Sequence, residues 1–97
     1  MNNIVRIKET SLPSTCFVFK NSTTCPVSAR AADVVRNANS DTPIYWIDVI
    51  EQRPISNWVS ETYKVKHESP QLLLINNSQV VQVWNHGRIS GECFAGS

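Results

Sequence analysis

"TCFVFKNSTTCPVSARAADVVRNA", residues Thr15 to Ala38, is the stretch that decides the fold of this chain. Residues 15–20 are mostly β-branched and aromatic, and they predict a strand bounded by a proline before and by polar residues after. Residues 26–38 place valine and alanine at helical spacing, and Pro26 suits the first position of a helix. Cys25 therefore stands where a strand passes directly into a helix.

The rest of the chain continues this alternation of strand and helix. Residues 43–50, "PIYWIDVI", predict a mostly apolar strand of the kind that a parallel sheet buries on both faces. Residues 54–65 predict a helix, residues 70–84 predict a hairpin, and the last residues, "ISGECFAGS", predict a short final helix. This order predicts one α/β domain over residues 1–97, thioredoxin-like, with a central four-stranded mixed sheet flanked by helices on both faces.

Composition and charge argue against several classes of partner. The chain has 97 residues and a net charge of +1, without a block of like charge, so we expect no nucleic-acid partner. No apolar run approaches the roughly 20 residues that span a bilayer, and the start lacks a secretory apolar core, so we expect no membrane partner and a cytoplasmic location. The three cysteines and two histidines lack the spacing of metal ligands, so we expect no metal.

Cys25 has two interpretations at this stage. At the start of a helix, backbone N–H groups without intrahelical partners favour the thiolate over the thiol. Ser28 follows at a spacing that lets its hydroxyl and N–H reach the sulfur, Thr24 adds a hydroxyl, and Pro26 presets the first helical residue. The alternative is a small apolar side chain that fills a corner between strand and helix.

Pro70 favours the reactive interpretation. It lies 45 residues after Cys25, immediately before the apolar strand "QLLLI". A proline that enters a central strand removes a ladder donor and needs a reason. A cis Ser69–Pro70 bond beside the thiol is one, because it blocks metal access and turns the backbone of Ser69 toward an incoming substrate chain.

Four segments together carry a resemblance to a known family: "KNSTTCPVSARA" (20–31), "DVIEQRPISN" (48–57), "VKHESPQLLLI" (65–75) and "NHGRIS" (85–90). They resemble the YtxJ family of the bacillithiol system, the monothiol bacilliredoxins. The resemblance implies a glutaredoxin-like oxidoreductase with Cys25 as its active cysteine. It also implies that Ser28 occupies the place of a second cysteine in dithiol relatives and that Pro70 is the cis proline of the thioredoxin superfamily.

The resemblance further implies that Cys25 removes bacillithiol from mixed disulfides on client proteins. Bacillithiol would be a co-substrate, with no permanently bound cofactor, and the protein is expected to act as a monomer. Bacillithiol carries a malate, so its site needs anion donors, for which His86, Gly87 and Arg88 are candidates, while the backbone of Ser69 is a candidate for pairing with the ligand or client. The alternative function is a non-catalytic interaction or redox-sensing module in which Cys25 is modified without turnover.

The sequence also allows predictions about the roles of four other residues. Cys16 lies inside a predicted strand and is expected to be buried and inert. Cys93 is either a helix residue without a role or a distal resolving thiol. Asp48 is expected to cap a strand end or to pair with Arg53, with a proton-acceptor role as the alternative. For His67, a hydrogen bond that stabilises its loop competes with a contact to substrate.

Overall fold

A computed structural model describes residues 3–24 and 26–95. Its strands are β1 (Ile4–Arg6), β2 (Cys16–Asn21), β3 (Ile44–Asp48), β4 (Gln71–Asn76) and β5 (Gln79–Asn85). Its helices are α1 (Pro26–Arg36) and α2 (Arg53–Tyr63), and two short 3₁₀ helices follow β5, η1 (His86–Arg88) and η2 (Gly91–Phe94). Within the described residues the strands form one sheet in the order β1-β3-β2-β4-β5.

The sheet is mixed, as predicted, but it has five strands rather than four. Strand β2 runs parallel to β3 and antiparallel to β4, and β4 pairs with β5 as the predicted hairpin. The additional strand is β1, which pairs in parallel with the outer side of β3. Three residues are too few for the period-two pattern of a strand to emerge from the sequence, which is why this edge strand was not predicted.

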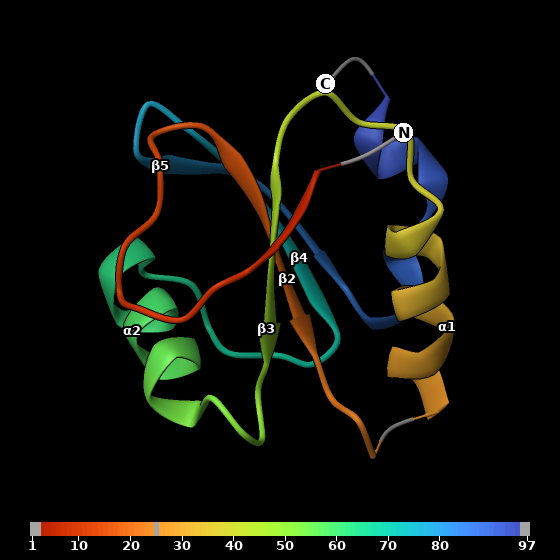
Figure 1. Cartoon of the computed structure of the whole chain (residues 1–97), viewed down its shortest axis with the longest axis horizontal. Coiled ribbons are helices and arrows are strands. Elements are labelled where there is room, and N and C mark those ends of the chain that lie inside the picture. The colour runs from red at the N-terminus through yellow and green to blue at the C-terminus, as the bar shows by residue number, and fades with distance from the viewer. Residues whose placement is uncertain (1–2, 25, 96–97) are drawn as a thin grey trace.

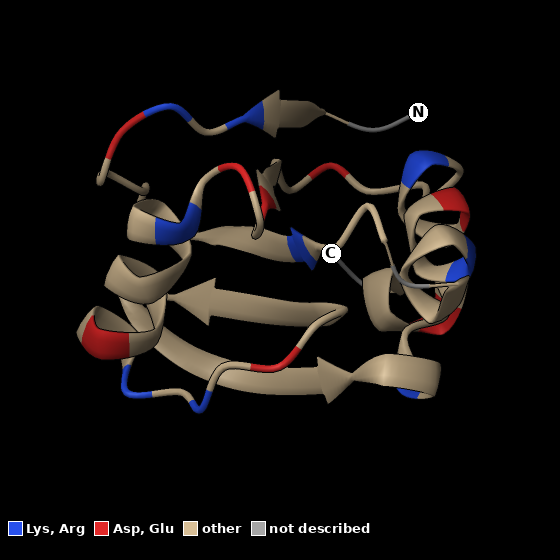
Figure 2. Cartoon of the chain, turned by 90° about the horizontal axis from the view of Figure 1, so that it is seen from below, with Lys and Arg blue, Asp and Glu red and all other residues tan. Residues whose placement is uncertain are grey.

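The two helices cover opposite faces of the sheet (Figure 1), and Figure 2 shows the sheet standing between them. Side chains of a strand alternate between faces, so β2 contributes to two cores. Phe17 and Phe19 pack toward α1, in a cluster with Trp46 of β3. Val18 packs toward α2, in a second cluster with Val59. Because both faces are covered, all six residues of β2 are buried.

The end of the chain departs from the expected helix. The hairpin turns at Asn77 and Ser78, both with positive φ, which is the conformation that a two-residue hairpin loop requires. Among the described residues after β5, up to residue 95, the helical elements are the 3₁₀ helices η1 and η2. Ser90 and Cys93 exchange capping hydrogen bonds at the start of η2, so a single capped turn replaces the helix predicted there.

Candidate active site

Three segments of the predicted site meet at one end of the sheet. Because β2 and β4 are antiparallel, Lys20 near the end of β2 pairs with Gln71 at the start of β4. Gln71 pairs in turn with Asn85 at the end of β5. The loop into α1, the loop that precedes β4 and the turn after β5 therefore lie at the same end, which is the lower end of the sheet in Figure 1.

The loop between β2 and α1 is held by hydroxyl groups. The backbone N–H of Ser22 donates to Oγ of Ser28 at 3.3 Å, and Ser28 is fully buried. The hydroxyls of Ser22 and Thr24 are also within hydrogen-bonding distance of each other, at 3.3 Å. Cys25 itself lies outside the described residues, so its predicted contacts with Thr24 and Ser28 stay predictions.

Helix α1 begins at Pro26, as predicted, and runs for 11 residues. Its first turn contains no acidic residue, so no negative side-chain charge there neutralises the positive end of the helix dipole. An anion immediately before Pro26 is therefore favoured electrostatically, which is the condition that the thiolate interpretation of Cys25 requires.

The loop that precedes β4 carries the other predicted elements. The Ser69–Pro70 peptide bond is cis, and the carbonyl of Pro70 accepts the backbone N–H of His86 at 2.9 Å. Within the described residues, Oγ of Ser69 and Oε1 of Gln71 are buried and have no hydrogen-bond partner. Both orphan atoms lie next to Pro70 in the chain, where a docking partner is expected.

His86 is engaged by a residue that the sequence reasoning did not single out. Its Nε2 lies 2.9 Å from Oε1 of Glu68, and the other carboxylate oxygen of Glu68 lies 3.7 Å from Nζ of Lys66. His86 therefore joins the turn after β5 to the loop before Pro70. The signal that could have indicated Glu68 is its place in "HESP", directly before Ser69 and Pro70.

Gly87 and Arg88 complete η1, which packs against α1. The guanidinium of Arg30 on α1 donates to the carbonyl of Ile89 at 3.4 Å, so a second arginine stands at this contact. The side chain of Arg88 is exposed, and a Cβ added to Gly87 would meet nothing within 4 Å. Anion binding by Gly87 and Arg88 remains a prediction, and Arg30 is an addition to their surroundings.

Asp48 pairs with a different arginine from the one expected. Its carboxylate lies 2.9 Å from Nη1 of Arg6 rather than pairing with Arg53, and it accepts hydrogen bonds from Asn21 and Trp46. Burial alone would raise the pKa of Asp48, but these hydrogen bonds and the charge of Arg6 hold it below its ordinary value. Asp48 thus stabilises the ends of β2 and β3 as a carboxylate, which makes it a poor proton acceptor.

The two described cysteines are both buried and free. Burial raises the pKa of Cys16 to about 12, in agreement with its expected inertness. Cys93 lines a hollow with Thr15 and Phe17, at the start of β2, whereas the predicted site adjoins the other end of this strand. At about 3.3 Å per residue, the steps from Cys16 to Asn21 separate the two ends of β2 by roughly 16 Å, which argues against Cys93 as a resolving thiol.

His67 makes a hydrogen bond within the protein, one of the two roles considered for it. Its Nδ1 lies 3.2 Å from Nζ of Lys20, whose side chain is completely buried. The sequence pattern places Lys20 at the end of the strand, and no role was predicted for it. A lone charge in the apolar run "FVFK" could have indicated a buried lysine with partners.

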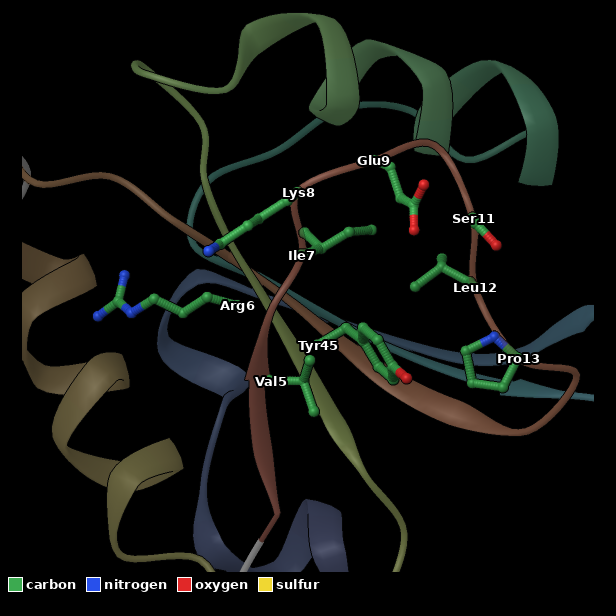
Figure 3. A pocket seen from close by; sticks show the side chains of 9 residues that line it. All are labelled: Val5, Arg6, Ile7, Lys8, Glu9, Ser11, Leu12, Pro13 and Tyr45. Atoms are coloured by element: carbon green, nitrogen blue, oxygen red, sulfur yellow. The ribbon is translucent and has the colours of Figure 1, made fainter.

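A hollow of the described surface lies away from these segments. It measures about 490 Å³ and is formed by β1, the loop that follows it and Tyr45 of β3 (Figure 3). None of the predicted site residues lines it, since it lies on the opposite side of β2 from β4. A smaller hollow of about 260 Å³ adjoins the predicted site, between Ser22 and Thr23 and the outer side of α1.

Among the described residues, none of the helices combines the length and the apolar character that a membrane span needs. Among the same residues, no three His, Cys, Asp or Glu side chains gather as potential metal ligands.

Comparisons with known proteins agree with this geometry. The family model of the monothiol bacilliredoxin BrxC matches residues 1–93. A solved oxidoreductase with a thioredoxin fold is similar over 95% of this chain and 90% of its own, with 29% identity and a TM-score of 0.77. An N21Q thioredoxin from Halobacterium salinarum NRC-1 (18% identity, 95% and 82% covered, TM-score 0.65) and Malassezia sympodialis thioredoxin (16%, 88% and 78%, 0.62) share the fold.

Proposed function

This chain belongs to the monothiol bacilliredoxin family of thioredoxin-like oxidoreductases, and we propose that it removes bacillithiol from mixed disulfides on client proteins through Cys25. The observation that carries the proposal is the meeting of two segments at one end of the sheet. The start of α1, directly after Cys25 in the chain, and the cis Pro70 loop lie at that end. This arrangement supports a nucleophile at Cys25 beside a docking segment at Pro70.

The chemistry is thiol–disulfide exchange. The Cys25 thiolate attacks the bacillithiol sulfur of the mixed disulfide, the client thiolate leaves and takes up a proton, and Cys25 carries the bacillithiol as a new disulfide. The thiolate of a second bacillithiol then attacks the bacillithiol sulfur held by Cys25. This step releases bacillithiol disulfide and restores the Cys25 thiolate, so atoms and electrons balance.

The surroundings favour both steps. The first turn of α1 has no acidic residue, so its dipole stabilises Cys25 as nucleophile and as leaving group. The backbone of Ser69 beside the cis peptide bond offers hydrogen bonds to the arriving chain. Arg88 and Arg30 supply positive charge at η1 and α1, where the malate carboxylates of bacillithiol would be held, and Gly87 leaves the backbone of η1 open.

The proposal includes the setting of the reaction. Bacillithiol is the co-substrate, no resident cofactor takes part, and bacillithiolated client proteins are the partners of a monomeric enzyme. The reaction is assigned to the cytoplasm, because reduced low-molecular-weight thiols are maintained there.

A transfer assay tests the proposal. The protein is mixed with a bacillithiolated client protein and free bacillithiol, and the released client thiol is measured over time. We expect multiple turnovers by the wild type, none by Cys25→Ser, and nearly unchanged turnover by Cys16→Ser as the matched control. Modification of Cys25 without turnover of the client would instead favour the sensing module and would overturn the proposal.

A further inference from the structure

Lys20 is a buried charge that the proposed reaction does not use. Its side chain points to the α2 face of the sheet, with Cys16 and Val18 on the same side of β2, and its exposed fraction is 0%. Burying an ammonium group is costly unless its hydrogen-bonding capacity is satisfied. A lysine at this position therefore needs partners.

Three acceptors surround the ammonium group of Lys20, one for each of its N–H donors. Nζ of Lys20 lies 3.1 Å from the carbonyl of Ser56, 2.7 Å from Oγ of Ser60 and 3.2 Å from Nδ1 of His67. An ammonium has three N–H donors and no acceptor, so these three contacts use all of its capacity. The contact with His67 requires a lone pair on Nδ1, which assigns His67 as the neutral tautomer with its proton on Nε2.

His67 belongs to the loop that carries the cis peptide bond. Nε2 of Gln71 donates to the carbonyl of Lys66 at 3.0 Å, which fastens the start of this loop to β4. The backbone N–H of His86 donates to Pro70 at the other end of the loop. Lys20 joins the middle of the loop to β2 and, through Ser56, to helix α2.

We propose that Lys20 is a positioning residue that acts through His67. By fixing His67 against α2, it holds Ser69 and Pro70 in the conformation that receives the client. The inference rests on the proposed function in one respect, namely that this loop is the docking segment for the mixed disulfide. Neither residue touches the reacting sulfur atoms in this account.

The contact is strongest when Lys20 is protonated and His67 is neutral. If His67 gains a proton, Nδ1 becomes a donor and faces the donors of Lys20. If Lys20 loses a proton, two N–H groups remain for three acceptors. The other charged groups near the pair are Arg53 of α2 and Glu68 of the same loop.

These groups set the pH range of the contact. Burial lowers the pKa of Lys20 to about 8. Burial, followed by the charge of Lys20, lowers the pKa of His67 below 6.5, with Arg53 acting in the same direction and Glu68 opposing. The charge-assisted contact therefore weakens as the pH falls through the lowered pKa of His67 and as the pH rises through about 8.

Nuclear magnetic resonance tests the contact itself, without reference to catalysis. Long-range ¹H–¹⁵N spectra at neutral pH should show an unprotonated Nδ1 and a protonated Nε2 on His67. In Lys20→Met the pKa of His67 should move up toward 6.5, and the amide signals of Ser69 and Gln71 should shift. A protonated Nδ1 in the wild type, or unmoved amide signals in the variant, would overturn the inference.

Kinetics on a bacillithiolated client peptide test the positioning role. Lys20→Met should raise KM by about tenfold, the loss expected of one charge-assisted hydrogen bond, and change kcat by less than about twofold. His67→Ala should raise KM in the same way. His67→Gln keeps an amide oxygen that accepts from Lys20, so its KM should equal that of the wild type. Because glutamine does not titrate, this variant should also keep its activity at acid pH, where protonation of His67 weakens the contact in the wild type. Lys8→Met is the control, an exposed lysine outside the loop.

The failures of the two proposals are distinguishable. A wild type that turns over no bacillithiolated client contradicts the proposed function, and the amide shifts of Ser69 and Gln71 still decide the positioning role. A wild type that turns over, with an unchanged KM in Lys20→Met, contradicts the positioning role alone. Alkylation of Cys25 by iodoacetamide should be unchanged in Lys20→Met, and a parallel loss of alkylation would show that Lys20 acts on the thiol rather than on the loop.

Discussion

The backbone N–H of Ser22 donates to the buried Oγ of Ser28 at 3.3 Å, so the loop that leaves β2 is fastened to the first turn of α1. In the chain the two residues stand on either side of Cys25. At the position where the family resemblance implies a second cysteine in dithiol relatives, Ser28 thus has a hydroxyl with a structural partner.

Removing this hydroxyl has a predictable cost. Ser28→Ala leaves the N–H of Ser22 without its acceptor, and we expect a loss of about 1 kcal/mol in the free energy of unfolding, together with slower alkylation of Cys25 at neutral pH. Urea denaturation and iodoacetamide kinetics measure the two effects. Ser11→Ala, at an exposed hydroxyl outside this site, should change neither. Unchanged stability in Ser28→Ala would contradict the assigned role of the hydrogen bond.

Lys20 is expected to cost the protein stability. Its pKa falls from 10.5 to about 8 on folding, so between these values the unfolded chain binds more protons and stability rises with pH. Below pH 8 the buried charge costs up to roughly 3 kcal/mol, by the conversion of a pKa shift to free energy. Lys20→Met should therefore be more stable at neutral pH, and its advantage over the wild type should shrink as the pH rises from 8 to 10.5.

Unfolding by urea at several pH values checks this, with Lys8→Met as the control. Oγ of Ser60 keeps a partner in the variant, since it also donates to the carbonyl of Ser56. A variant less stable than the wild type would show that Lys20 has a net stabilising role.

Asp48 should contribute stability that acid removes. Its pKa is lowered in the folded protein, so its contribution is present above its ordinary value of 3.8 and is lost as the pH falls through the folded value. Asp48→Ala leaves the donors of Asn21 and Trp46 without their acceptor and should cost about 1–3 kcal/mol at neutral pH. The difference in unfolding free energy between the wild type and Asp48→Ala should narrow below pH 3.8. A difference independent of pH would contradict the charged state assigned to Asp48.

The three cysteines should differ sharply in reactivity. Cys16 is completely buried with a pKa of about 12, and Cys93 is a buried residue whose Sγ takes part in the hydrogen bonds that cap η2. Iodoacetamide at neutral pH should therefore modify Cys25 in the native protein and leave the other two intact, and all three should react in denaturant. Peptide mapping after brief labelling measures the modification of each cysteine. Rapid native labelling of Cys93 would reopen its role as a resolving thiol.

Much of the fold follows from local sequence signals. The strand before Cys25, the helix that begins at Pro26 and the hairpin turn at Asn77 and Ser78 each depend on residues close in the chain, and each is found where the pattern predicts it. A five-strand sheet instead of four follows from β1, whose strand character comes from pairing with β3 rather than from its own three residues.

The contacts that sequence reasoning missed are long-range ones. Asp48 pairs with Arg6 across 42 positions and Lys20 contacts His67 across 47, and no local pattern encodes which distant partner a charge will meet. The expected partner of Asp48, Arg53, is close to it in the chain, yet the carboxylate pairs with Arg6 instead. Bringing Ser69, Pro70 and His86 to one end of the sheet required only the strand order, whereas the Glu68 contact of His86 required the structure.

Mass spectrometry of a single-turnover reaction tests whether bacillithiol is transferred from the client to Cys25. The reduced protein is mixed with an equimolar bacillithiolated client in the absence of free bacillithiol, and both chains are mapped by peptide. The account predicts that bacillithiol moves from the client to Cys25, with the client thiol released in equal amount and Cys16 and Cys93 unmodified. A client that keeps its bacillithiol while Cys25 stays reduced would contradict it.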